Sequence, residues 1–280
     1  MAKTAWITGA SSGLGLHTAM VLAKRGYQVA AGARSFGKEE NKVAGCLCLP
    51  LDVTQEASIA SFIAAAKESF GPPDILINCA GVLNLCAYES YGPGEVEKVM
   101  EVNFLGQVKM ISHVLPLMRE KGRGKIINFS SINGLMGIPF QGAYVASKHA
   151  IEGYSECLQL ECRPHGIEVM VVRPGDHQSG GQGYRAHGLG MQADSPYREA
   201  YEKACHVIHW DESHGCDPDR LGEKIVRALE KKRLPRTLCV AKLDQHLAVW
   251  LHDLLPARLF EKIITSYYRK TKDGEGIFHE

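Results

Sequence analysis

Short apolar runs alternate with longer helical patterns along most of this chain, and the alternation restricts the folds that it can adopt. Apolar runs typical of strands occupy residues 3–8, 27–33, 46–49, 75–79, 125–129, 167–172 and 237–240. Helical patterns occupy residues 14–25, 56–70, 95–118, 144–162, 196–210 and 217–232. Strands and helices that alternate at this spacing predict an α/β fold, with a doubly wound parallel sheet covered by helices on both faces.

Polar and glycine-rich segments follow several of the predicted strands. They begin after Thr8 and at Arg34, Asp52, Asn78, Ser131 and Pro174. Parallel sheets bind their ligands beyond the carboxyl ends of the strands, and these segments fall at those ends. We therefore expect one binding site along this edge of the sheet.

The segment TGASSGLG, residues 8–15, joins the first predicted strand to the first predicted helix. Its glycines allow a tight turn and let the backbone approach a ligand, and the helix N-terminus offers N–H groups and a positive dipole to a pyrophosphate. Such a turn can serve strand–helix packing alone. Its position in an alternating chain favours a Rossmann-like dinucleotide site.

The end of the second predicted strand indicates which dinucleotide binds. Chains that bind NAD usually carry an acidic residue there, which holds the ribose hydroxyls. Here the strand ends in AAGA, residues 30–33, and Arg34 follows. A guanidinium suits a 2′-phosphate, so we expect NADP(H) to be preferred over NAD(H). The alternative is that Arg34 is a solvated loop residue.

Tyr144 and Lys148 lie in the stretch GAYVASKHA, residues 142–150. Four residues are about one helical turn, so both side chains should lie on one face of the predicted helix. The ammonium is either a solvated neighbour or a group that prepares the phenol to give up its proton. The spacing alone leaves both possibilities open.

The motifs occur together in an order that identifies a family. They are TGASSGLG, LDVT at 51–54, NCAG at 78–81, Asn103, Ser131, YVASK at 144–148 and RPG at 173–175. With this order and spacing, the sequence resembles the short-chain dehydrogenase/reductase family over about residues 3–180. The stretch GLMGIPFQGAYVASKHAIEGYSECL is similar to the branch that contains hydroxysteroid and retinol dehydrogenases.

The resemblance implies catalytic roles for the matching residues. Tyr144 would be the general acid in reduction and the base in oxidation, and Lys148 would lower the pKa of its phenol and bind the nicotinamide ribose. Ser131 would bind the substrate carbonyl and stabilise the developing alkoxide. Asn103 would lie at a helix irregularity and hold a water that links Lys148 to solvent.

The resemblance also implies binding residues, among which Asp52 would contact the adenine and Asn78 would support the backbone of the site. The expected cofactor residues are Gly9, Ser11, Ser12, Gly13, Leu14, Gly15, Arg34, Asp52, Val53, Asn78, Ala80, Gly81, Tyr144, Lys148, Pro174, Gly175 and Ser179. The expected substrate residues are Ser131, Met136, Ile138, Phe140 and Tyr144.

One segment departs from the family pattern. After RPG the family commonly has two apolar residues, a variable residue and a threonine that binds the nicotinamide carboxamide. This chain has Asp176, His177, Gln178 and Ser179 there. The serine keeps a hydroxyl group, so cofactor binding can persist. Asp176 and His177 either change the contacts near the nicotinamide or are turn residues that point to solvent.

We expect a single domain over residues 1–280, with a cofactor-binding and catalytic core at 1–175, a helical substrate lid at 176–215 and a C-terminal helical extension at 242–280. The extension carries an apolar stripe formed by Leu254, Leu255, Leu259, Phe260, Ile263, Ile264 and Tyr267. Such a stripe usually packs on the domain, and it could cover the substrate entrance. Membrane contact is not expected, because the stripe lacks a dense basic face.

Composition argues against several other classes. The net charge of +1 argues against a nucleic-acid-binding protein, and no run of 18 apolar residues predicts a membrane span. The nine cysteines are odd in number and scattered, which is typical of a reducing compartment. Because a strand begins at once in MAKTAWITGA, no signal sequence is expected, and a cytoplasmic location is predicted. The segment 205–216 contains Cys and His but fits no zinc spacing, so no metal is expected.

We therefore predict an NADP(H)-dependent oxidoreductase that interconverts a ketone or aldehyde and its alcohol. Met136, Ile138 and Phe140, together with the lid and the tail, predict a bulky apolar substrate such as a steroid- or retinoid-like molecule. The alternatives are a reductase of small carbonyls or 3-oxoacyl thioesters, and a non-catalytic protein that senses NADP(H). The resemblance also implies a homodimer or homotetramer through the helices at 96–118 and 144–162.

Overall fold

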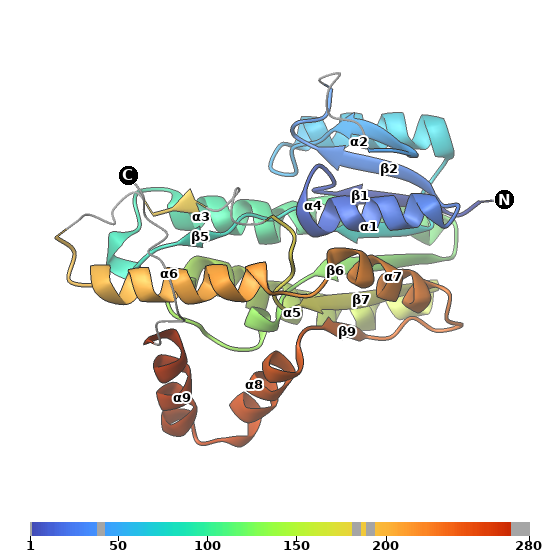
Figure 1. Cartoon of the computed structure of the whole chain (residues 1–280). Helices are drawn as coiled ribbons and strands as arrows, with labels where there is room; N and C mark the ends of the chain where they lie inside the picture. Colours follow the sequence, from blue (N-terminus) through green and yellow to red (C-terminus); the bar gives the residue numbers. More distant parts are fainter. Residues whose placement is uncertain (1, 38–42, 181–185, 189–193, 270–280) are drawn as a thin grey trace.

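A parallel sheet forms the centre of the computed structural model, which describes residues 2–37, 43–180, 186–188 and 194–269 (Figure 1). Its seven strands lie in the order β3-β2-β1-β4-β6-β7-β9. Their bounds are β1 Thr4–Thr8, β2 Gln28–Ala33, β3 Cys46–Pro50, β4 Ile75–Asn78, β6 Gly124–Phe129, β7 Ile167–Pro174 and β9 Thr237–Val240. The chain runs outward from β1 to β3 and then returns to the other side of β1, so the order reverses between β1 and β4. Ligands of doubly wound sheets bind at such a reversal.

The central strands end at one level. Thr8 pairs with Gly32 of β2 and with Asn78 of β4, and Asn78 pairs in turn with Asn128 of β6. Strand β1 is buried along its whole length. A parallel strand covered on both faces needs no polar side, which explains why its sequence does not alternate. The register brings the segments that follow β1, β2, β4 and β6 to one edge of the sheet.

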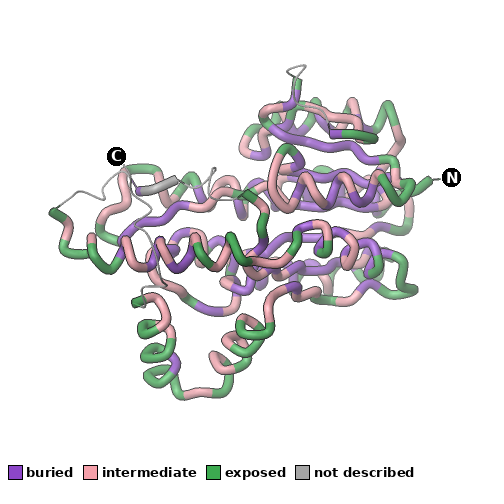
Figure 2. Tube along the Cα trace, viewed as in Figure 1, coloured by how far each residue is buried: buried purple, intermediate pink, exposed green. Residues whose placement is uncertain are grey.

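Helices cover both faces of the sheet, as the sequence predicts (Figures 1 and 2). Side chains of α1 and α7 share one apolar core with the sheet, and those of α2, α4 and α5 share the other. Strand β1 serves both, because Ile7 faces the first core and Trp6 the second, where its ring meets Phe62 edge-on. The bounds are α1 Gly13–Lys24, α2 Glu56–Phe70, α4 Gly106–Glu120, α5 Gly142–Cys162 and α7 Pro218–Leu229.

The helix predicted over 95–118 is interrupted. It consists of α3 Glu95–Met100, a π-helical turn at Glu101–Leu105 and then α4. Asn103 lies within the π turn, at the helix irregularity where the sequence analysis expects it. The residue after the π turn is glycine, Gly106, because a Cβ atom there would lie 2.6 Å from Cγ2 of Val53.

Several elements lie outside the main sheet. A short parallel pair joins β5 Asn84–Leu85 to β8 Ala186–His187. Strand β8 lies in the predicted lid segment 176–215, of which residues 181–185 and 189–193 lie outside the described residues. Helix α6 spans Arg198–Ser213. The tail forms two helices, α8 Leu243–Leu254 and α9 Ala257–Arg269, because Pro256 holds the preceding Leu255 in an extended conformation. In Figure 1 these two helices form a V beside the β9 end of the sheet.

Candidate active site

A cavity of about 570 Å³ lies at the carboxyl edge of the sheet. Its lining comes from the glycine-rich turn after β1, the ends of β2, β4, β6 and β7, and helices α5, α6, α8 and α9. The expected site residues that line it are Gly9, Ser11, Ser12, Gly13, Leu14, Gly15, Arg34, Asp52, Val53, Ala80, Gly81, Ser131, Met136, Ile138, Tyr144, Lys148, Pro174, Gly175 and Ser179. The fold therefore brings together residues that are far apart in the sequence.

The turn after β1 has a shape that only glycine permits. Gly9 has a φ of +71°, and a Cβ atom on it would lie 2.7 Å from Cα of Ala80. A Cβ atom on Gly15 would lie 2.2 Å from the carbonyl oxygen of Gly9. The Thr8 hydroxyl accepts hydrogen bonds from the backbone N–H groups of Cys79 and Ala80, at 3.1 and 3.0 Å. The turn is thus fixed against the end of β4, and the N-terminus of α1 faces the cavity.

The N-terminus of α1 is suited to an anion. Ser12 is the N-cap residue, and its side chain makes no capping hydrogen bond to the helix. No acidic residue occurs in the first turn. Backbone N–H groups of a first helical turn have no partner within the helix, so they can bind a phosphate.

Arg34 and Asp52 stand at the outer end of this region. Arg34 is exposed beyond β2, and both residues line the cavity. Burial by itself would raise the pKa of Asp52, but hydrogen bonds from the backbone and hydroxyl of Thr54, at 3.0 and 2.8 Å, and the charges of Arg34 and Lys109 lower it. The site therefore offers a guanidinium and a carboxylate side by side.

Asn78 and Asn103, both predicted as site residues, do not line the cavity. Asn78 is fully buried and donates to the side-chain oxygen of Asn128 at 3.0 Å. Asn103 accepts from the backbone N–H of Val82 at 2.7 Å and donates to its carbonyl at 2.9 Å and to the Ser147 hydroxyl at 3.0 Å. The Asn78 amide thus joins the ends of β4 and β6, whereas that of Asn103 holds the segment after β4 and ties it to α5.

Lys148 is buried beside the ring of Tyr144, with 5.4 Å between its Nζ and the ring centroid. The ammonium donates to the carbonyl of Phe129, at the end of β6, at 2.8 Å. Burial lowers its pKa from the usual 10.5 to about 8, although the charges of Cys79 and Glu152 act in the opposite direction. Lys148 is thus not a solvated surface lysine, which excludes one of the two possibilities that the spacing leaves open.

Ser131 follows β6 and caps a short 3₁₀ turn at Ile132–Gly134. Its hydroxyl accepts from the backbone N–H of Asn133 at 3.2 Å and donates to the carbonyl of Pro174 at 3.4 Å. The second of these bonds is long, so the hydroxyl can turn toward a ligand. Ser131 and Tyr144 both line the cavity.

Asp176 and His177 face the interior, which excludes the possibility that they are turn residues pointing to solvent. His177 is only 5% exposed, and its Nδ1 lies 2.9 Å from the carbonyl of Gly175. The amide of Gln245, on α8, donates to the Asp176 carboxyl group. Burial and the nearby Asp211 and Glu212 raise the pKa of Asp176 to about 7, against opposing effects of Lys242 and Gln245.

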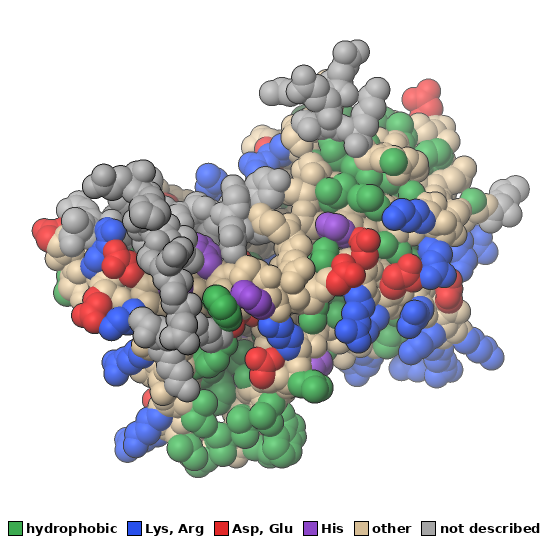
Figure 3. Space-filling model, in the orientation of Figure 1, with side chains coloured by type: hydrophobic (Ala, Val, Ile, Leu, Met, Phe, Trp, Pro, Cys, Tyr) green, Lys and Arg blue, Asp and Glu red, His purple; other side chains and the backbone are tan. Residues whose placement is uncertain are grey.

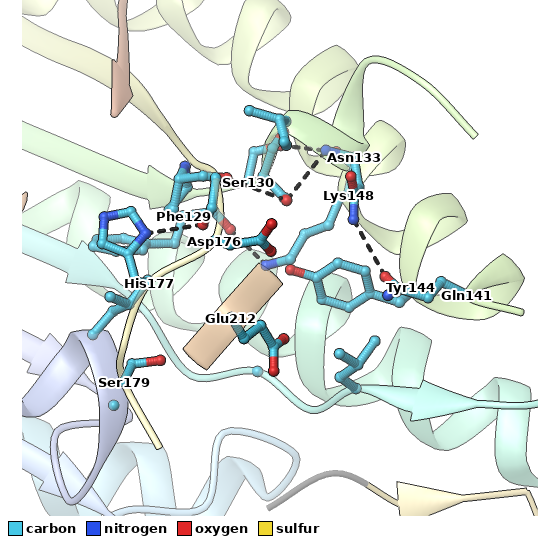
Figure 4. A pocket seen from close by; sticks show the side chains of 18 of the residues that line it. Phe129, Ser130, Asn133, Gln141, Tyr144, Lys148, Asp176, His177, Ser179 and Glu212 are labelled. Atoms are coloured by element: carbon cyan, nitrogen blue, oxygen red, sulfur yellow. Dashed lines mark hydrogen bonds between the residues drawn. The ribbon is translucent and has the colours of Figure 1, made fainter. Parts of the chain in front are cut away.

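Asp176 turns its carboxyl group toward the hydroxyl of Tyr144 (Figure 4), and Glu212 also lines the cavity. The cavity therefore has a polar, acidic part next to the Tyr144 hydroxyl. Sequence reasoning missed Asp211, Glu212 and Gln245 here, because no motif marks them and only the packing of α6 and α8 brings them to the cavity.

An apolar wall completes the cavity. Met136 and Ile138 contribute as predicted, whereas Phe140 lies outside the lining and packs edge-on against Tyr201, with ring centroids 5.4 Å apart. The other apolar lining residues from α6, α8 and α9 are Ile208, Leu247, Ala248, Leu251, Phe260, Ile263 and Ile264. The apolar stripe in the tail sequence pointed to Phe260, Ile263 and Ile264, but nothing indicated the residues of α8.

The cysteines and histidines of the segment 205–216 do not line the cavity, although Ile208, Asp211 and Glu212 of the same segment do. Cys205 is buried with Leu85 and Tyr201 in an apolar cluster, and Cys216 bridges to His177 through the backbone. Within the described residues, no group of three or more His, Cys, Asp or Glu side chains could hold a metal ion. All nine cysteines lie within the described residues, and none of them forms a disulfide bond.

None of the described helices combines the length and the apolar character that crossing a bilayer requires.

Comparison with known proteins agrees with this geometry. The profile of the short chain dehydrogenase family matches residues 3–187. The chain is 38% identical to a 3-ketodihydrosphingosine reductase of Bacteroides thetaiotaomicron over 262 residues, which cover 94% of this chain and 96% of the relative.

Solved structures of the same kind are similar throughout. A short-chain dehydrogenase from Streptomyces avermitilis has a TM-score of 0.82 and 28% identity, covering 97% of this chain and 100% of its own. An alcohol dehydrogenase from Thermococcus sibiricus, complexed with 5-hydroxy-NADP, has a TM-score of 0.69 and 25% identity, covering 87% and 97%. Profile, relatives, sheet order and site geometry all agree, and the chain belongs to the short-chain dehydrogenase/reductase family of oxidoreductases.

Proposed function

We propose that this protein is an NADP(H)-dependent enzyme that interconverts a bulky apolar ketone and its alcohol by hydride transfer. The observation that carries the proposal is the convergence of Ser131, Tyr144 and the buried Lys148 on one cavity with the glycine-rich turn. A protein that only sensed the nucleotide would have no need of this set.

The residues of the turn fit a dinucleotide. Gly13 has a φ of +55°, and a Cβ atom on it would meet no atom closer than 3.7 Å, so the turn leaves room for a ligand against its backbone. The N-terminus of α1 would hold the pyrophosphate. Arg34 would bind the 2′-phosphate of NADP(H), and the low pKa of Asp52 keeps a carboxylate nearby for other polar groups. The complex of the archaeal alcohol dehydrogenase with 5-hydroxy-NADP supports this type of cofactor.

When bound, the nicotinamide would supply the hydride in reduction and accept it in oxidation. Tyr144 would give a proton to the carbonyl oxygen as it becomes an alkoxide, and Ser131 would donate a hydrogen bond to the same oxygen. The Lys148 ammonium, 5.4 Å from the centre of the phenol ring, favours release of that proton by its positive charge. With a pKa of about 8, Lys148 keeps most of this charge at neutral pH.

The two parts of the cavity suggest an amphipathic substrate. Residues of α8 and α9 would hold a long apolar chain, while Asp176 and Glu212 would receive hydroxyl or ammonium groups next to the reacting carbon. The relative that is named a 3-ketodihydrosphingosine reductase supports a long-chain ketone as the candidate. A cavity of about 570 Å³ favours such a molecule over a small carbonyl.

The test is the oxidation of NADPH and of NADH by the purified protein with 3-ketodihydrosphingosine, a steroid ketone and a small aldehyde. We expect NADPH and a bulky ketone to give the highest rate. Tyr144→Phe should lower kcat about a thousandfold, because it removes the proton donor.

Tyr154→Phe is the matched control, because Tyr154 lies on the same helix but packs edge-on against Phe104, with ring centroids 5.8 Å apart, and does not line the cavity. It should keep the full rate. Nucleotide binding without turnover of any ketone or alcohol would contradict the proposal and favour the sensor. Turnover that survives Tyr144→Phe would contradict the role of the phenol.

A further inference from the structure

Helix α8 exposes one continuous apolar stripe. Leu243, Leu247, Trp250 and Leu254 follow one another at helical spacing, and they are 89%, 51%, 60% and 58% exposed. On α9, Leu259 and Ile263 are 47% and 42% exposed. These six residues are called the tail patch below. Figure 3 shows hydrophobic side chains gathered at the end of the molecule where Figure 1 shows α8 and α9.

The exposure of this stripe differs from the sequence expectation. The sequence predicts that the apolar stripe of the tail packs on the domain, and Phe260 does so at 7% exposed. Leu254, Leu259 and Ile263 belong to the same predicted stripe but remain exposed. The expectation is wrong for these three residues, because two helices that meet in a V can each bury only one side.

The tail patch is concentrated rather than scattered. Of the eleven large apolar side chains that are exposed among the described residues, six lie on α8 and α9. Single exposed apolar residues are ordinary, whereas a contiguous group of large ones marks a surface that binds something.

The tail patch continues into the cavity. Leu247 and Ile263 are about half exposed and also line the cavity that contains Tyr144. An apolar path therefore leads from the outer surface of the tail to the cavity. A protein partner or a second copy seated on the tail patch would cover this path, whereas a lipid surface would supply apolar molecules to it.

The polar side chains around the tail patch also suit a bilayer. Trp250 is a side chain that favours the interface between lipid and water. Exposed Arg258 and Lys262 lie one turn apart on α9 and could contact anionic headgroups. The acidic residues Asp244, Asp253 and Glu261 also lie on the two helices, so the apolar contact should dominate and the charge should add a smaller effect.

Although the sequence analysis expects no membrane contact, because the tail lacks a dense basic face, we propose that α8 and α9 dock on the surface of a lipid bilayer through the exposed tail patch and admit an apolar substrate from it into the cavity. The tail patch would enter the headgroup region, as amphipathic helices do without spanning the membrane. The docking of the tail patch does not depend on the proposed function, whereas the entry of an apolar substrate from the bilayer rests on it.

The test is flotation of the full chain with vesicles of phosphatidylcholine, with and without phosphatidylglycerol. We expect the protein to float with both and more strongly with the anionic vesicles. The triple variant Trp250→Gln, Leu254→Gln, Leu259→Gln should bind at least about tenfold more weakly to both, because three large side chains no longer enter the lipid. Arg258→Gln with Lys262→Gln should weaken binding about threefold, and only to the anionic vesicles.

Two controls separate docking from misfolding. Leu160→Gln changes an apolar side chain that is 69% exposed on α5, and vesicle binding should not change. None of the three residues in the triple variant lines the cavity, so nucleotide binding and turnover of a small carbonyl should persist.

The proposal fails if the wild-type chain does not float, or if the triple variant floats as well as the wild type. It also fails if the wild type ignores vesicles and the triple variant forms a smaller oligomer in analytical ultracentrifugation, since the tail patch would then join copies of the chain. Flotation of a wild-type protein that turned over no ketone would refute the proposed function and leave the docking surface supported.

Discussion

The two ends of the cavity are built in different ways. At the end formed by the turn after β1, backbone atoms form the wall. Gly9 and Gly15 lie so close to neighbouring carbonyl and Cα atoms that neither has room for a side chain, and the Thr8 hydroxyl binds the segment after β4. At the other end, the wall comes from side chains on α6, α8 and α9, several of which are partly exposed. A single added methyl group would obstruct the first end. The second could exchange one apolar residue for another and remain apolar.

This difference separates the tasks of the two ends. A site built from backbone has fixed positions, as the binding of a constant group such as a pyrophosphate requires. A wall built from side chains changes with each substitution, so it sets which substrate fits. Under the proposed function, the glycine-rich turn serves the cofactor, and the helices of the tail serve the substrate.

The largest effect should come from adding a methyl group at the first end. Gly15→Ala places a Cβ atom 2.2 Å from the Gly9 carbonyl, so the turn must open. We expect nucleotide affinity to fall at least about a hundredfold, measured by fluorescence titration with NADPH. Gly153→Ala is the control, because Gly153 is an exposed helical position with nothing within 4 Å of the new Cβ atom.

The control should raise the stability by about 0.5–1 kcal/mol, since alanine is the better helix former. If Gly15→Ala bound NADPH as tightly as Gly153→Ala does, the first end would not be the rigid one, and the comparison would collapse.

A second substitution tests the charge at the same end. Arg34→Ala should raise the Kd for NADPH about ten- to a hundredfold, because a charge-assisted bond to the 2′-phosphate is lost. The Kd for NADH should change little. Equal effects on both nucleotides would mean that Arg34 does not read the phosphate, and a preference of the wild type for NADH would contradict the cofactor assignment itself.

The parts that the sequence predicted well are those that depend on local pattern. The alternation of apolar runs and helical stretches determines the parallel sheet, and the glycine spacing determines the turn after β1. Both are local because a buried strand needs an apolar run and a tight turn needs glycine. The stacking of Tyr144 and Lys148 follows from one helical turn in the same way.

The parts that the sequence predicted poorly depend on contacts between distant elements. The helix irregularity at Asn103 is expected only from the family resemblance, because no periodicity in 95–118 indicates the π turn or the hydrogen bonds between Asn103 and Val82. Phe140 is apolar and close to Met136 in sequence, yet its ring turns to Tyr201 instead of the cavity. The break of the tail could have been predicted from Pro256, but the exposure of one side of α8 depends on where the two helices meet.

The smallest effect, and the one that compares the two ends directly, concerns their carboxyl groups. The pKa of Asp52 is lowered, whereas that of Asp176 is raised from 3.8 to about 7. A raised pKa means that the folded state binds the proton more tightly than the unfolded state between pH 3.8 and about 7. Stability is therefore lost as the pH rises through that range. The stability is lost because the buried Asp176 carboxyl group becomes ionised beside Asp211 and Glu212.

Asp176→Asn removes this charge and keeps an oxygen for the amide of Gln245. At pH 8 the variant should be more stable than the wild type by about 2 kcal/mol, roughly half the value of a full shift of this size, because the group is partly solvated. At pH 4 the difference should disappear.

Asp52→Asn should act with the opposite sign and lower the stability at pH 8, since its carboxylate is favoured by Thr54, Arg34 and Lys109. Thermal unfolding at both pH values measures the pair. If both substitutions moved the stability in the same direction at pH 8, the two ends would share one electrostatic character, and the acidic part beside Tyr144 could not be what distinguishes the substrate end.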